Sequence, residues 1–175
     1  MIPLFLRRLN LMSPYVVWEQ GGNYSFSSDY GITFSVSFEE ADTYEVHEAF
    51  WFSLMNRSHT PSPSDPKVQQ TIVCIIEEFF RVNSSVLLYM CDTADSQQAA
   101  RSRLFLRWFH EADKQERYLI KTAMIKDGSQ ENYIALIIQR SHPDYDAIVQ
   151  FFDEEVALFK ANKPGNPESD MTEHP

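Results

Sequence analysis

The sequence predicts an α+β fold, in which helices pack on a mixed, mostly antiparallel sheet in the element order β-β-β-α-β-α-β-β-α. Three observations lead to this prediction. Apolar and polar residues alternate early in the chain, as they do in strands with one buried face. Apolar residues recur at helical spacing in three later segments. The short apolar runs between those segments have the length of strands.

The first strands are expected in the first third of the chain. Residues 24–38 alternate around the turn Ser28-Asp29-Tyr30-Gly31, which predicts a hairpin with one buried face. Residues 47–56 are rich in Phe, Trp, Leu and Met without alternation, which predicts a strand covered on both faces. A loop rich in Ser and Pro follows at residues 57–64.

The first helix has clear start signals. Asp65 is a favoured N-cap residue, and Pro66 then stands at the first helical position. Apolar residues continue at helical spacing until the helix ends near Asn83. The wholly apolar run 86–90 predicts a strand in the middle of a covered sheet.

The remaining elements complete the order. A second helix is expected over residues 96–110, after a cap at Asp95 or Ser96. Two strands, at residues 118–125 and 133–139, are joined by a turn at Asp127 and Gly128. A last helix begins near Ser141, Pro143 and Asp144, which form an arrangement like a capping box.

Length and composition predict one domain with irregular ends. A chain of 175 residues that is 43% hydrophobic can form one core, which we place at residues 23–160. Residues 1–22 are expected to be an N-terminal extension that is partly loose. Met12 offers a second plausible start, so residues 1–11 are either an artefact of an upstream start or a loose tail. Residues 161–175 contain too few apolar side chains to offset their ordering entropy and should be a disordered tail.

Charge and cysteine content exclude several classes of partner. The net charge of -10 repels polyanions, so neither nucleic acid nor an anionic membrane is expected as a partner. No apolar run reaches the length of about 20 residues that spans a bilayer. Cys74 and Cys91 lie in apolar segments, which predicts two reduced structural thiols and a cytoplasmic location. The sequence carries no signal for an oligomeric state.

Most motifs of catalysis and cofactor binding are missing. The five glycines are spaced so that neither a P-loop nor a dinucleotide-binding fingerprint can form. The five histidines and two cysteines lack the spacing of a zinc site, so we expect neither a cofactor nor a metal. Adjacent acidic pairs are interpreted as solvated surface charge: Glu39 with Glu40, Glu77 with Glu78, and Glu154 with Glu155.

One segment, residues 89–109, is not explained by packing alone. On a helix, Arg101 lies on the same face as the apolar residues, so its permanent charge needs an acceptor there. Asp92 and Asp95 are the nearest acceptors in the sequence. Two interpretations remain open: an ion pair that stabilises the turn, or a pocket at the strand end lined also by Gln98.

The opposite side of the same predicted helix carries a second candidate surface. Arg103 and Arg107 are one helical turn apart, and Arg and Trp are favoured at protein interfaces. Two interpretations of these two arginines remain open: charges that only confer solubility, or a surface in this acidic protein for an anion or an acidic partner. The candidate ligand or partner residues are Asp92, Asp95, Gln98, Arg101, Arg103, Arg107 and Trp108.

These motifs resemble a known family. The run Asp65-Pro66-Lys67-Val68, followed by the spaced Cys91-Asp92, Asp95, Gln98, Arg101, Arg103, Phe105 and Trp108-Phe109, is similar to an uncharacterised domain-of-unknown-function family of small bacterial proteins. The resemblance covers about residues 24–159. It implies a bacterial, cytoplasmic setting and no particular chemistry.

The element order is also similar to the fold of GNAT acyltransferases. That similarity implies a helix start whose backbone N–H groups, in a glycine-containing turn, hold the pyrophosphate of coenzyme A. The matching stretch, residues 57–71, contains no glycine, and Phe105 stands where such enzymes commonly have a catalytic tyrosine. An acyl-CoA site on this chain would therefore be degenerate.

Three functional hypotheses follow, and the balance is against an enzyme. The favoured one is a non-catalytic binding or regulatory module with a protein partner. The alternative is a GNAT-like acyltransferase with a degenerate acyl-CoA site. The third is an unrelated enzyme built on Asp92, Asp95 and Arg101.

Overall fold

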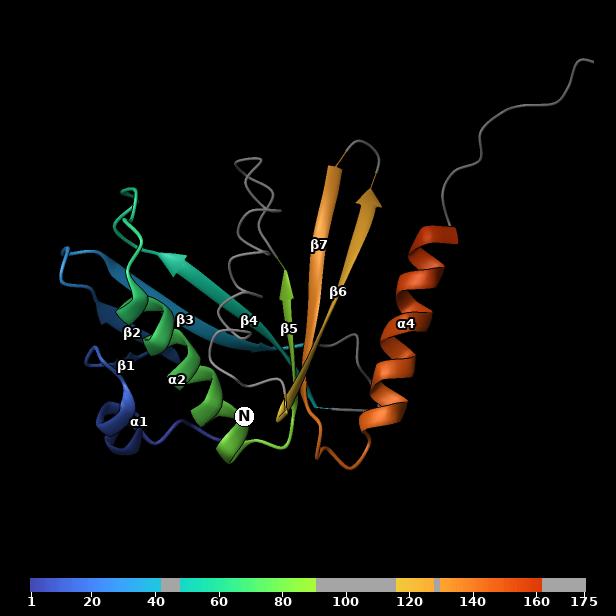
Figure 1. The fold of residues 1–175 in the computed structure, drawn as a ribbon, viewed down its shortest axis with the longest axis horizontal. Coiled ribbons are helices and arrows are strands. Elements are labelled where there is room, and N and C mark those ends of the chain that lie inside the picture. The colour runs from blue at the N-terminus through green and yellow to red at the C-terminus, as the bar shows by residue number, and fades with distance from the viewer. Residues whose placement is uncertain (42–47, 91–115, 128–129, 162–175) are drawn as a thin grey trace, which may run out of the picture.

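A computed structural model gives the fold of this chain and describes residues 1–41, 48–90, 116–127 and 130–161 (Figure 1). Seven strands form one sheet in the order β1-β2-β3-β4-β5-β7-β6. The strands are β1 (Trp18–Gln20), β2 (Asn23–Ser27), β3 (Thr33–Glu40), β4 (Ala49–Asn56), β5 (Val86–Met90), β6 (Tyr118–Asp127) and β7 (Gln130–Gln139). The helices in the described ranges are α1 (Leu6–Met12), α2 (Pro66–Val82) and α4 (Tyr145–Ala161).

The sheet is mixed but mostly antiparallel. Each described strand pairs antiparallel with its neighbours except β4 and β5, which are parallel and in register from Ala49 opposite Val86 to Phe52 opposite Tyr89. Parallel strands need a crossover connection, and α2 provides it. Strand β7 lies between β5 and β6, because β6 and β7 form a hairpin whose second strand pairs with β5. The predicted α+β class is confirmed.

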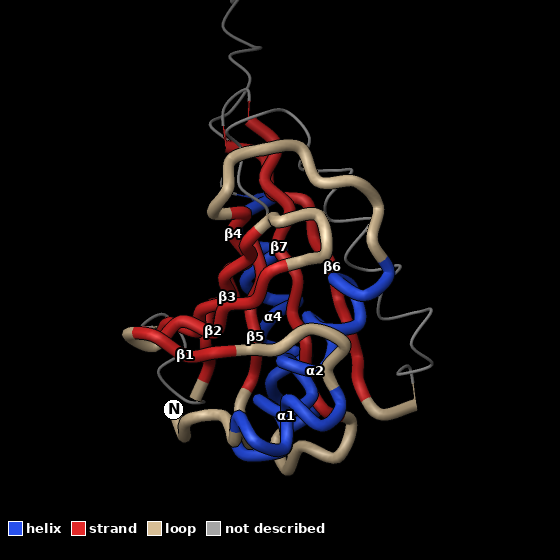
Figure 2. Tube along the Cα trace, turned by 90° about the vertical axis from the view of Figure 1, so that its left-hand side faces the viewer, coloured by secondary structure: helices blue, strands red, loops and turns tan. Residues whose placement is uncertain are grey.

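Helices cover both faces of the sheet. Helices α1 and α2 lie side by side on one face in both views, and α4 lies on the other face beside β6 and β7 (Figures 1 and 2). Leu87 and Tyr89 of β5 pack in the α2 cluster, whereas Val86 and Leu88 pack in the α4 cluster. Successive strand residues point to opposite faces, so the central strand is buried on both sides.

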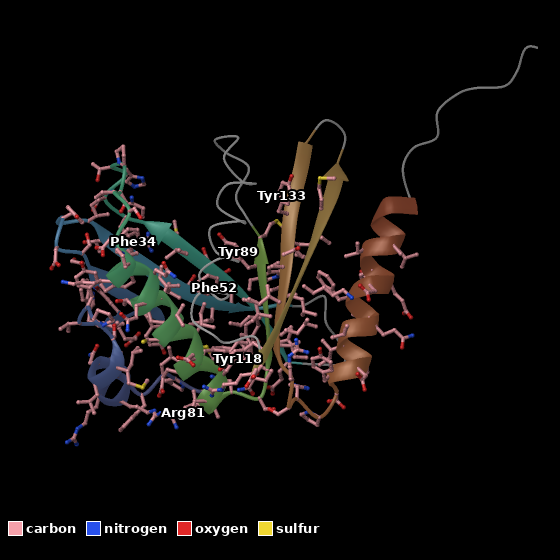
Figure 3. All side chains as sticks on the ribbon, viewed as in Figure 1. Phe34, Phe52, Arg81, Tyr89, Tyr118 and Tyr133 are labelled. Carbon is pink, nitrogen blue, oxygen red and sulfur yellow. The ribbon has the colours of Figure 1, made fainter. Side chains whose placement is uncertain are left out.

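The α2 side of the sheet holds an aromatic core. Phe34, Phe52, Tyr89, Tyr118 and Tyr133 come from five different strands and pack on this side (Figure 3). The ring of Phe79, on α2, is stacked on that of Phe38 with centroids 4.5 Å apart. This contact fixes the rotation of α2 on the sheet, because a turn of the helix would move Phe79 out of the core.

The predicted start of α2 is confirmed. Asp65 accepts a hydrogen bond from the backbone N–H of Lys67 at 2.9 Å, and Pro66 occupies the first turn. The chain leaves the helix at Asn83, whose backbone is extended. The run 86–90 is a strand with the predicted bounds.

One prediction differs from the structure, one lies outside it, and two short elements were not predicted. Met55 near the end of β4 is 46% exposed, so this strand is covered on both faces only in its first half. Helix α1 and strand β1 were not predicted, because each is too short to show a period. The second predicted helix, residues 96–110, lies outside the described residues.

Among the helices that the structure describes, none is long and apolar enough to cross a membrane. The division of the chain into residues 1–22, 23–160 and 161–175 stays a prediction. The structure adds that Leu4, Leu9, Tyr15 and Val17 are buried in the same core as α2.

Candidate functional site

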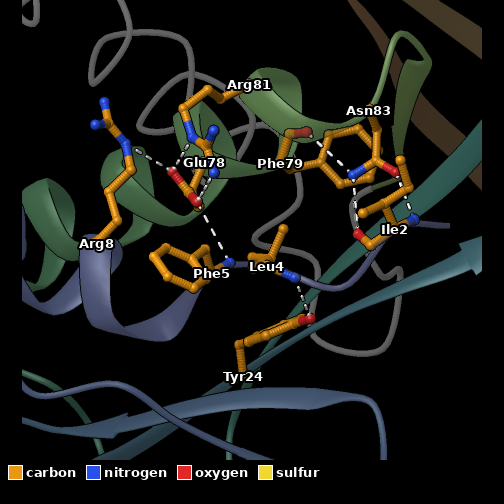
Figure 4. A network of polar contacts seen from close by, with 9 residues as sticks. All are labelled: Ile2, Leu4, Phe5, Arg8, Tyr24, Glu78, Phe79, Arg81 and Asn83. Carbon is orange, nitrogen blue, oxygen red and sulfur yellow. Dashed lines mark hydrogen bonds and ion pairs between the residues drawn. The ribbon is translucent and has the colours of Figure 1, made fainter.

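Residues 1–5 lie beside the C-terminal end of α2 and are held there through their backbone (Figure 4). The N–H of Ile2 donates to Asn83 Oδ1 at 2.7 Å, and Asn83 Nδ2 donates to the carbonyl of Ile2 at 3.2 Å. The N–H of Leu4 donates to the hydroxyl of Tyr24 at 2.9 Å. Asn83 and Tyr24 are both buried. Two side chains of the core therefore hold the N-terminal segment in place.

Glu78 of α2 is the third buried group that contacts this segment, and its residue is only 1% exposed. It accepts hydrogen bonds from Arg81 Nε at 2.8 Å and Arg81 Nη2 at 2.6 Å, and from the N–H of Phe5 at 3.3 Å. Arg8 Nε of α1 forms an ion pair with the same carboxylate at 3.3 Å. A buried carboxylate is tolerated when it is paired and hydrogen-bonded in this way.

The arginines determine the charge state of Glu78. Burial alone would raise the pKa of its carboxyl group, because it disfavours the charged form. The hydrogen bonds and charge of Arg81 act in the opposite direction, as do the N–H of Phe5 and the charge of Arg8. The net result is a pKa of Glu78 below its usual value, so the carboxylate is ionised at neutral pH.

The two guanidinium groups reach solvent although their shared carboxylate does not. The side chain of Arg8 is 50% exposed and that of Arg81 is 42% exposed, whereas that of Glu78 is fully buried. Arg8 approaches Glu78 with Nε, and its two terminal nitrogens point away from the carboxylate (Figure 4). Two positive charges thus share one negative charge at the surface of α1 and α2.

Exposed apolar side chains gather on the first 18 residues. Of the twelve large apolar side chains that are exposed in the described part of the chain, seven belong to residues 1–18. Helix α1 fully buries only Leu9; Leu6 is half-buried against the core, whereas Leu11 and Met12 remain at the surface. We call these seven side chains, together with Arg8 and Arg81, the N-terminal surface: Met1, Ile2, Phe5, Leu11, Met12, Val16 and Trp18.

A second polar cluster lies at the start of α2. The hydroxyl of Tyr15 donates to Asp65 Oδ2 at 2.7 Å and accepts from the N–H of Asp29 at 3.1 Å. Lys67 Nζ contacts Asp29 Oδ2 at 2.7 Å and lies 5.6 Å from the ring centroid of Tyr15. Burial and the neighbouring carboxylates raise the pKa of Tyr15. Its hydroxyl therefore stays protonated at neutral pH and acts as a structural donor.

The residues singled out from the sequence lie elsewhere. Asp92, Asp95, Gln98, Arg101, Arg103, Arg107 and Trp108 all fall in residues 91–115, outside the described part of the chain. The structure describes β5, the strand that leads to them, where Tyr89 is buried and Met90 is 49% exposed. The pocket and the partner surface expected on residues 92–108 stay predictions.

The interpretation of Glu78 as solvated surface charge is wrong. The sequence did indicate that Glu78 lies on the buried face of α2. Thr71, Cys74 and Ile75 precede Glu78 by seven, four and three residues, so all four lie on one face of a helix. All four are buried. A carboxylate on such a face predicts a cationic partner, and Arg81 stands three residues further on.

The described residues contain no group of three or more His, Cys, Asp or Glu side chains that could hold a metal ion.

A model of a family of unknown function, DUF6169, matches residues 64–154, which is more than half of the chain. Glu78, Arg81 and Asn83 lie inside this range, whereas residues 1–18 lie outside it. A comparison with curated proteins gave no match.

Proposed function

We propose that this chain, which belongs to DUF6169, a family of unknown function, is a non-catalytic binding module whose partner is a protein. The observation that supports the proposal is the concentration of exposed apolar side chains on residues 1–18, among which Phe5 contacts the carboxylate that holds two half-exposed arginines. Aromatic residues, Met and Arg are enriched at protein interfaces.

The exposure of these side chains is unfavourable in water. Leu11 is 83% exposed, Val16 is 74% exposed and Phe5 is 58% exposed. Burying one such side chain fully contributes about 1.5–3 kcal/mol. A partner that covers two or three of them would gain enough free energy to form the centre of an interface.

The test is a pair of substitutions in the full chain. We expect the wild-type protein to capture a stoichiometric protein partner from its native host, and the double variant Phe5→Ser plus Leu11→Ser to lose it. Leu158→Ser is the matched control, since Leu158 is 57% exposed and lies on α4. Capture that survives the double substitution, with the fold intact by circular dichroism, would contradict the proposed surface.

The alternative function, acyl transfer with a degenerate acyl-CoA site, has one observation in its favour. The parallel strands β4 and β5 are joined by α2, so a helix start lies next to the end of a central strand. Phosphates bind at a helix start through unpaired N–H groups. Here Pro66 has no N–H, Asp65 accepts from the N–H of Lys67, and Asp29 adds a second carboxylate. This geometry disfavours a pyrophosphate.

Thermal unfolding with acetyl-CoA tests this alternative. A ligand at about 100 times its dissociation constant stabilises the folded state by about 2.7 kcal/mol. We expect millimolar acetyl-CoA to leave the melting temperature unchanged. A saturable rise that disappears when Lys67 is replaced by glutamate would favour the acyltransferase.

The setting that we propose for the module is the bacterial cytoplasm. Cys74 is a buried free thiol, which is consistent with a reducing compartment. Cell fractionation of the native host, followed by thiol labelling of the unfolded protein, tests the location and the redox state together. Recovery outside the cytoplasm would contradict this part of the proposal.

A further inference from the structure

We infer that Arg8 and Arg81 form a preorganised anion-binding site, which takes an acidic or phosphorylated side chain of the protein partner. The inference rests on the proposed function and names the chemistry of one contact. Three features support it: the buried carboxylate that orients both guanidinium groups, the donors that remain on them, and the apolar side chains beside them.

Glu78 fixes the two guanidinium groups before any partner arrives. Arg81 contacts both carboxylate oxygens, at 2.8 Å and 2.6 Å, and Arg8 contacts one of them at 3.3 Å. Glu78 itself is held by α2 and by the N–H of Phe5. Part of the side-chain entropy that an arginine loses on binding is therefore already lost in the unbound protein.

The two arginines keep donors that Glu78 does not use. A guanidinium group has five N–H donors. Arg8 directs Nε to Glu78 while its two terminal nitrogens point away (Figure 4). Two cations on one carboxylate leave one excess positive charge, and both side chains are about half exposed. A second anion would balance this charge and form charge-assisted hydrogen bonds.

The surroundings favour a protein segment over a membrane. The net charge of -10 repels an anionic bilayer, and this repulsion acts over the whole molecule. An amphipathic protein segment needs only a local match of charge and apolar surface. Phe5 lies beside Glu78 in the network and is 58% exposed, and Ile2 is 59% exposed. An acidic segment with apolar side chains satisfies both requirements.

Inorganic phosphate and acetate are the probes, and sodium chloride at equal ionic strength is the control. The full chain is titrated with each salt while the NMR signals of the arginine Nε–H groups are followed. We expect saturable shifts of the Arg8 and Arg81 signals with phosphate or acetate. Arg8→Gln should weaken this binding about tenfold, because one charge-assisted contact is lost. Glu78 keeps Arg81 in this variant, so the fold should persist.

Arg7→Gln is the matched control, because Arg7 is the exposed neighbour of Arg8 and should leave the affinity unchanged. Equal binding by Arg8→Gln would mean an adventitious ion only and would overturn the site. Binding to phosphatidylserine vesicles that depends on Arg8 would overturn the protein partner. Arg8→Lys serves as a second variant, which keeps the charge and loses the forked geometry, and it should bind with intermediate affinity.

Two results separate this inference from the proposed function. If a partner is captured through Phe5 and Leu11 and remains bound to the Arg8→Gln variant with unchanged affinity, the anion site is wrong and the binding module stands. If phosphate binds through Arg8 and no partner is captured, the site stands and the binding module is wrong.

Discussion

The side-chain amide of Asn83 makes with Ile2 the two backbone hydrogen bonds that a neighbouring strand would make, at 2.7 Å and 3.2 Å. The amide of Asn10 does the same for Val17, at 2.7 Å and 2.8 Å. Val17 directly precedes β1, and Ile2 precedes α1. Amide side chains thus satisfy backbone groups that would be costly to bury unpaired.

Replacing Asn83 by alanine should destabilise the protein by about 1–3 kcal/mol, because the N–H and carbonyl of Ile2 lose their partner and the buried carbonyl of Phe79 keeps only the backbone N–H of residue 83. Urea unfolding measures the change. Asn23→Ala is the control, since the hydrogen bond of Asn23 to Gly21 is exposed, and it should change the stability by no more than about 0.5 kcal/mol. Equal effects of the two substitutions would show that Asn83 does not secure the N-terminal segment.

Acid should weaken the protein through Glu78, whose pKa is lowered in the folded state. Its contribution to the free energy of unfolding is complete above the unfolded pKa, about 4.3, and is lost as the pH falls through the folded pKa. Urea unfolding of the wild type and Glu78→Gln between about pH 7 and pH 3 tests this linkage. The two proteins should differ by about 1–3 kcal/mol near neutral pH and converge in acid. Parallel curves would contradict the lowered pKa.

Alkaline pH should weaken the protein through buried tyrosines. Burial is the main cause that raises the pKa of Tyr24 and of Tyr118 above the usual value. Their contribution is complete below the unfolded pKa, about 10, and is lost as the pH rises through the folded pKa values. As the pH rises, part of the increase in tyrosinate absorbance should therefore occur only when the protein unfolds. Tyr24→Phe should reduce this part. A single early titration of all tyrosines would count against this prediction.

Phe79→Ala should lower the free energy of unfolding by about 3–5 kcal/mol, because Phe79 is fully buried and contacts the rings of Phe38, Phe50 and Phe80. Phe5→Ala is the matched control: its ring is 58% exposed, so the loss should stay below about 1 kcal/mol. Thermal unfolding of both variants measures the contrast. A large loss for Phe5→Ala would assign Phe5 to the core and weaken its proposed role in partner binding.

Helix α2 could be predicted because its signals are local. Asp65 caps the N–H of Lys67, two residues away, and the apolar period runs through one continuous segment. The alternation in β2 and β3 is local in the same sense. Its outcome, with Tyr24, Phe26, Phe34 and Val36 buried, follows from the period of two.

The N-terminal surface could not be predicted in this way. Helix α1 has seven residues and buries one of them, Leu9, so no period identifies its inner face. The bonds that position the segment join Ile2 to Asn83 across 81 positions, and Phe5 to Glu78 across 73. The residues predicted from the sequence as a site, Asp92 to Trp108, lie outside the described residues and stay predictions.

The sequence by itself determined the fold class, the strong negative charge, the approximate positions of the strands other than β1, and the bounds of β5 and α2. Each of these depends on composition or on residues a few positions apart. Only the tertiary structure decided that β7 lies between β5 and β6, that Arg8 pairs with Glu78, and that Ile2 binds Asn83 at the end of α2. The physical reason is that strand neighbours and ion pairs form across long sequence separations. A local pattern shows that a face must be covered, and it does not say which distant segment covers it.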